Sequence, residues 1–222
     1  MENASKALVM AGGILIALLV VGALMLMINQ VSYYEKSESI SEKAQQQAEF
    51  NKEYVKFTYG DIKGYEVISL VNKVIDYNKK DATGNSVDYN LKITVNIDMS
   101  GFADKYGING KTVLFKKNYI INNTNTSFYN DIEKYRELEN NYSLAIMSKL
   151  SANYDKLKQV EDNSNEYKKA IKEITGRDIQ ITISDIEKYR EYSEFKTSTF
   201  EPGEVKYHEN GQVKEMSFKF KK

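Results

Sequence analysis

An unbroken apolar run opens the chain. No residue from Ala7 to Ile28 is charged, and as a helix rising about 1.5 Å per residue this run measures roughly 33 Å. The hydrocarbon core of a bilayer is about 30 Å thick. The pattern therefore predicts a transmembrane helix within residues 1–30. Because the apolar core of a cleavable signal peptide has only about 7–15 residues, the length favours a retained anchor over a removed signal.

Helical spacing continues beyond the apolar run. The segment from Asn29 to Phe57 has no proline or glycine, and apolar residues such as Val31, Tyr34 and Ile40 recur along one face of a helix. Gly60 is a natural stop signal. We therefore expect the helix to extend through residues 31–60 as an amphipathic segment rather than to end at the membrane surface.

Small residues recur within the predicted span. Gly13 and Ala17 lie four positions apart, a spacing that lets membrane helices approach closely. Glycine and alanine are also common in any transmembrane helix, so self-association and simple spanning both remain open. The residues assigned to the span are Ala7, Gly12, Gly13, Ala17, Gly22 and Ile28.

The remaining residues, 61–222, have the patterns of an α+β head domain. A helix is expected after Lys63, because Val67, Val71 and Val74 fall on one helical face. Apolar residues alternate strictly from 87 to 99, which predicts a strand with one buried face. Asn210-Gly211 separates two further alternating runs, a typical hairpin signature. We expect a helix packed on an antiparallel β-sheet.

A largely helical insertion is predicted at about 100–190, inside this head. Its apolar spacing is helical through much of the segment, and Gly176 is placed to end its last helix. The expected elements are a loop at 101–110, a strand at 111–121, mostly helix at 128–160, a short helix at 165–175 and a short strand at 177–183.

Charge and composition exclude several classes of function for this protein. The 31 basic and 31 acidic residues cancel, whereas nucleic-acid binding relies on a basic excess, so no nucleic-acid partner is expected. The sequence has no cysteine, which excludes disulfides and thiolate sites. His208 is the single histidine, and on a strand beside a turn it is expected to be an exposed surface residue. No catalytic motif, cofactor loop or metal-ligand spacing is found, so we expect neither an enzyme nor a bound cofactor or metal.

The layout resembles a known group of proteins. The segment Ala4-Ser5-Lys6-Ala7 precedes the apolar helix, the amphipathic extension follows, and the stretch from Gly64 to Lys73 precedes a sheet. Together with the stretch from Tyr192 to Lys196 and the Asn210-Gly211 hairpin, this is similar to the pilin-like single-pass membrane proteins of clostridia-type bacteria, and in layout to type IV and Tad-type pilins or pseudopilins. Type IV pilins carry a glutamate five residues into the mature helix, where this chain has Ser5.

The resemblance implies a function and a location. It implies a structural subunit of a pilus-like or pseudopilus-like cell-envelope assembly, with the bilayer, further copies or pilus-assembly proteins as partners of the N-terminal helix. The alternative is a monomeric, adhesin-like binding module on the same membrane anchor. Lys6 before the span and Lys36 and Lys43 after it give little orientation signal. We place the C-terminal domain outside a bacterial cell membrane.

Overall fold

The computed structural model describes residues 2–80, 91–107 and 111–221, and it divides into two compact units, residues 1–50 and 51–222. The first unit is a single helix. Helix α1 (Glu2–Val55) runs through it without interruption and contributes its last turn to the second unit. A 3-10 turn, η1 (Lys56–Thr58), follows, and Gly60 adopts a left-handed φ of 83°. The predicted helical extension and its stop near Gly60 are confirmed.

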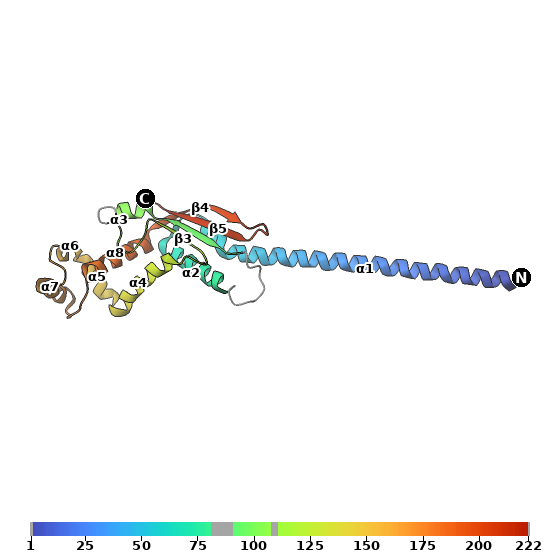
Figure 1. Ribbon diagram of the computed structural model, residues 1–222, viewed down its shortest axis with the longest axis horizontal. Coiled ribbons are helices and arrows are strands. Elements are labelled where there is room, and N and C mark those ends of the chain that lie inside the picture. Colours follow the sequence, from blue (N-terminus) through green and yellow to red (C-terminus); the bar gives the residue numbers. More distant parts are fainter. Residues whose placement is uncertain (1, 81–90, 108–110, 222) are drawn as a thin grey trace. The chain divides into compact units, whose positions relative to one another are not determined.

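The second unit is an α+β fold around a five-stranded sheet (Figure 1). Its strands lie in the order β1-β4-β5-β2-β3. Their bounds are β1 (Ile62–Lys63), β2 (Thr94–Asp98), β3 (Asn118–Ile121), β4 (Thr199–Tyr207) and β5 (Val213–Phe220). The helices are α2 (Gly64–Lys80), α3 (Ser100–Tyr106), α4 (Ser127–Asn141), α5 (Leu144–Ala152), α6 (Tyr154–Leu157), α7 (Asn165–Thr175) and α8 (Ile183–Thr197).

The sheet is mixed, which corrects the expected antiparallel sheet. Three neighbouring pairs are antiparallel, but β2 pairs with β5 in parallel, Val95 opposite Met216 and Ile97 opposite Phe218. A parallel pair needs a long crossover connection. Here the chain between the two strands contains β3 and β4 as well as α3 to α8. The helices lead to the start of β4, and β4 then runs antiparallel to β5, back to the end of the sheet where β2 and β5 begin.

The C-terminal hairpin forms as predicted. Strands β4 and β5 pair across a turn in which Gly211 has a φ of 81°. The register shifts between Lys206 and Tyr207, which pair with Glu215 and Val213 and leave Lys214 as the extra residue of a bulge. The approximate alternation in this strand had indicated a bulge near Glu215, and the structure places it one residue away.

The core lies between one face of the sheet and the helices. From the strand predicted at 87–99, Ile93, Val95, Ile97 and Met99 are buried, although β2 covers only 94–98 and residues 87–90 lie outside the described segments. Phe195 of α8 is at the centre of an aromatic cluster, with ring centroids 4.8 to 6.2 Å from those of its partners; these are Phe102, Phe115, Phe128 and Phe200.

Helix α2 meets α8 at very short range. A Cβ added at Gly64 would lie 1.8 Å from the carbonyl oxygen of Phe195, so only glycine fits at the start of α2. The apolar face predicted for this helix is buried, with Val67, Val71 and Val74 fully enclosed. This contact fixes α8 against α2 where both approach the sheet.

The central segment departs from its predictions at three places. Residues 100–106 form α3 where a loop was expected, and the strand expected at 111–121 shortens to β3. The strand expected at 177–183 is wrong: Thr182 and Asp185 form a reciprocal capping box that starts α8 at Ile183. The helices expected at 128–160 and 165–175 are confirmed as α4 to α7, and Gly176 ends α7 with a φ of 72°.

Candidate functional site

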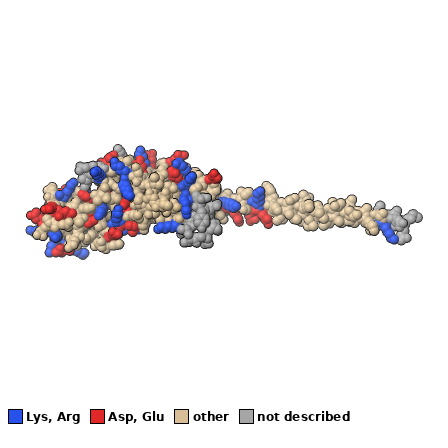
Figure 2. All heavy atoms as spheres, in the orientation of Figure 1, with Lys and Arg blue, Asp and Glu red and all other residues tan. Residues whose placement is uncertain are grey.

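The described apolar side chains of α1 from Val9 to Ile40 are exposed. The residues assigned to the predicted span all lie on this helix and are exposed, namely Ala7, Gly12, Gly13, Ala17, Gly22 and Ile28. Among the described residues, one helix is long and apolar enough to cross a membrane, and a signal sequence meets the same criteria of length and composition. Figure 2 shows this uncharged stretch with charged side chains near both ends. The helix is therefore compatible with a membrane anchor.

The small residues of α1 leave room on its surface. A Cβ added at Gly12, Gly13 or Gly22 would meet no atom within 4 Å. No contact among the described residues of this chain therefore explains why these positions are glycine.

The last turn of α1 is built into the C-terminal unit. The side-chain amide of Asn51 donates to the carbonyl oxygen of Gly211 at 2.8 Å, and its oxygen accepts from the backbone N–H of Val213 at 2.9 Å. Asn51 thus pairs with the hairpin as a neighbouring backbone would. These two bonds fix the final turn of α1 to the start of β5.

Further contacts of this turn involve α2. Tyr54 is buried, and its ring packs edge-on against Tyr77 with centroids 6.2 Å apart. The Lys73 ammonium lies 5.6 Å from the centre of the Tyr54 ring and forms an ion pair with Glu53. The final turn of α1 is therefore held by both the sheet and α2, through apolar, polar and charged contacts.

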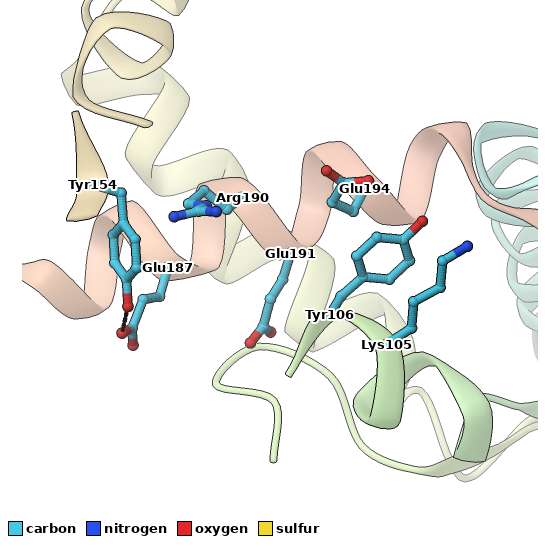
Figure 3. A pocket seen from close by; sticks show the side chains of 7 residues that line it. All are labelled: Lys105, Tyr106, Tyr154, Glu187, Arg190, Glu191 and Glu194. Atoms are coloured by element: carbon cyan, nitrogen blue, oxygen red, sulfur yellow. Dashed lines mark hydrogen bonds between the residues drawn. The ribbon is translucent and has the colours of Figure 1, made fainter. Parts of the chain in front are cut away.

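A pocket of about 190 Å³ lies beside α8 and α3 (Figure 3). Helix α8 supplies one wall from positions three and four apart, which share one helical face. The lining residues are Lys105, Tyr106, Tyr154, Glu187, Arg190, Glu191 and Glu194. The pocket therefore combines two aromatic rings with side chains of both charges.

Glu191 links α8 to the segment before β3 at one edge of this pocket. Its two carboxylate oxygens accept hydrogen bonds from the backbone N–H groups of Val113 and Leu114 at 2.7 and 2.8 Å. Burial raises the pKa of this carboxyl, and the backbone donors oppose that rise. Because both oxygens are already bonded, Glu191 is a structural residue that positions the segment before β3.

Arg190 is held at the other end by Tyr154. The centre of its guanidinium lies 4.2 Å from the Tyr154 ring centroid, within the range of a cation–π contact. The Tyr154 hydroxyl donates to Glu187 at 2.5 Å, as the dashed line in Figure 3 marks. Burial and this carboxylate raise the pKa of the Tyr154 hydroxyl, so it remains a protonated donor.

His208 does not contribute to this pocket. Its ring Nε2 lies 3.1 Å from the carbonyl oxygen of Lys92, and the residue is half-buried instead of fully exposed as expected. Within residues 2–80, 91–107 and 111–221, no group of three histidine, cysteine or acidic residues is placed to hold a metal ion. The predicted strand residue Tyr207 is exposed, and Tyr89 lies outside the described segments.

The pocket was not predicted from the sequence, because residues 183–197 were not predicted to form a helix. Once residues 183–197 are recognised as a helix, Glu187, Arg190 and Glu194 fall on one face by their spacing. The available signal was Thr182-x-x-Asp185, a capping box. No sequence pattern indicates that α3 supplies the facing wall, because that contact joins segments about 85 positions apart.

Comparison with known proteins finds no matching family, no matching curated protein and no matching solved structure. The pilin resemblance therefore stays a prediction from the residues.

Proposed function

We propose that this protein is a single-pass membrane subunit of a pilus-like or pseudopilus-like assembly of the bacterial cell envelope. The observation that carries the proposal is the single helix from Glu2 to Val55, which combines an exposed apolar half with a final turn fixed into a folded unit. An anchor alone needs only about 20 apolar residues. A helix that continues into the folded unit adds a segment through which copies can pack.

The apolar half of α1 is the proposed contact between copies. In a bilayer the lipid tails are as apolar as leucine, so helices associate by close packing at small residues. Gly13 and Ala17 share one face, and the glycine has open space around it. Neighbouring copies pack against this face, while the C-terminal unit lies outside the cell.

The assembly is tested by adding bulk to the proposed contact face. Replacing Gly13 and Ala17 together by leucine closes the face to a second helix, and we expect the yield of crosslinked oligomers in the native membrane to fall at least about tenfold. Gly22→Leu is the matched control, because at about 100° per residue it lies roughly half a turn from the other two. Equal yields from the double variant and the control would refute a contact at this face.

The orientation needs a separate measurement. The chain has no cysteine, so Lys169→Cys on α7 creates a unique thiol at an exposed position. A membrane-impermeant maleimide added to intact cells is expected to label this variant. Labelling only after cell lysis would place the C-terminal unit inside.

A further inference from the structure

A second hollow neighbours the pocket beside α8. This neighbour has a volume of about 330 Å³ and shares Lys105 and Tyr106 with the first. Its other lining residues come from the position before β1, the end of α8, the start of β4 and the last residues described; they are Asp61, Thr197, Ser198, Thr199, Phe220 and Lys221. The two neighbouring hollows, which share Lys105 and Tyr106 of α3, are together called the α8 groove.

Several polar groups of this groove are available to a ligand. Within the described part of the chain, the side chains of Tyr106, Arg190 and Glu194 form no hydrogen bond or ion pair. Arg190 is nevertheless held in place by the Tyr154 ring. The groove thus presents a pre-oriented donor, Arg190, beside Tyr154 at one end of the pocket, and the Tyr106 hydroxyl and the Glu194 carboxylate at the other end (Figure 3).

The groove is lined by charges of both signs, three basic and four acidic side chains. Asp61 and Lys221 pair with each other at 2.5 Å, and Glu191 is occupied by backbone donors. The charged side chains that remain are Lys105, Arg190, Glu187 and Glu194, two of each sign. A strongly cationic or anionic ligand would meet repulsion from one pair, whereas a neutral ligand with many hydroxyl groups can use donors and acceptors alike.

We propose that this groove binds a neutral oligosaccharide. A sugar ring has an apolar C–H face that suits the face of an aromatic ring, and its hydroxyl groups both donate and accept. Tyr106 supplies the aromatic surface, Arg190 donates to sugar oxygens, and Glu194 accepts from sugar hydroxyls. Tyr154 and Glu187 are positioning residues that hold Arg190. This site is independent of α1 and of the proposed assembly.

The test uses the full chain in phospholipid nanodiscs, which avoids sugar-based detergents. Chitotriose and cellotriose are the probes, and saturation transfer from protein to sugar is measured by NMR. Two probes show whether acetamido groups are required, and binding of either supports the site. Because single hydrogen bonds contribute modestly, we expect Glu194→Gln to weaken binding about three- to tenfold, whereas Glu173→Gln on α7 changes it less than about twofold.

A second variant keeps the result independent of stability. Tyr106 also packs against Phe102 and Phe220, so Tyr106→Ala is compared with Tyr106→Phe, which retains the ring. Binding retained by the phenylalanine variant and lost by the alanine variant supports stacking on the ring. Three results would overturn the proposal. They are no saturation transfer to either sugar, equal transfer from the wild type and from Tyr106→Ala, and displacement of the sugar by a trilysine peptide.

Discussion

Asn51 shows how a single side chain can join two parts of a fold. Its amide satisfies one carbonyl and one N–H of the β4–β5 hairpin, groups about 160 positions away in sequence. No local pattern in the sequence distinguishes this asparagine from the polar residues before it, because its partners are set by the tertiary fold. The residues that line the α8 groove are equally dispersed, with Tyr106 and Glu194 on different helices.

Replacing Asn51 by alanine tests this link. Two hydrogen bonds are lost and two backbone groups of the hairpin lose their protein partners, so we expect the C-terminal unit to lose about 1–3 kcal/mol of stability. Two measurements on the full chain test this: urea unfolding gives the loss of stability, and hydrogen exchange reports on protection of the Val213 amide. Gln46→Ala, at an exposed position of the same helix, is the control and should change stability by less than about 0.5 kcal/mol. A loss no larger than the control's would show that Asn51 does not hold the hairpin.

At the scale of elements, the local signals that succeeded are those that need no distant partner. The hairpin at Asn210-Gly211, the end of α7 at Gly176 and the apolar face of α2 depend on backbone conformation or on helical period, and each appears where predicted. The parallel pairing of β2 with β5 was missed, because strand order depends on the path of the chain through the helices between them.

Helix α8 illustrates a conflict between two local signals. Ile179, Ile181 and Ile183 alternate as in a strand, but the capping box at Thr182 begins a helix. The helix forms here because core packing supports the capping box: the apolar side of α8, including Ile186 and Phe195, is buried. The segment before it then forms a connection in which Ile181 alone is fully buried.

The start of α8 gives stability that depends on pH. Burial acts to raise the pKa of Asp185, but hydrogen bonds from Lys188 and Thr182 outweigh it and hold this pKa below its usual range. A carboxyl with a lowered folded-state pKa stabilises the fold above its unfolded pKa of about 3.9. This contribution is lost as the pH falls through the folded-state pKa.

Acid unfolding of an Asp185→Asn variant measures that contribution. We expect the wild-type chain to lose more stability than the variant when the pH is lowered from about 6 to about 2, because only the wild type gains a proton at this position on unfolding. Thermal unfolding at several pH values provides the comparison, with Asp178→Asn, an exposed residue before the helix, as the matched control. Parallel curves for wild type and Asp185→Asn would contradict the assignment.

At the scale of the whole molecule, the two units have different physical character. In the first unit the described apolar side chains from Val9 to Ile40 are exposed, whereas the second unit encloses a core beneath a surface carrying both charges (Figure 2). Exposed apolar residues along a full helix require a partner other than water. In the proposed assembly this partner is a bilayer together with neighbouring copies of the same helix, and the proposed oligosaccharide site would give the C-terminal unit a separate binding role.

The most direct measurement of the proposed assembly is the number of copies in the complex taken from its native membrane. Cells are treated with an amine-reactive crosslinker before extraction in a mild detergent, and the products are separated by mass. The proposed assembly predicts a ladder of multiples of the 25.5 kDa chain that extends beyond the dimer. A wild-type chain that is retained in the membrane but recovered only as the 25.5 kDa monomer would contradict it.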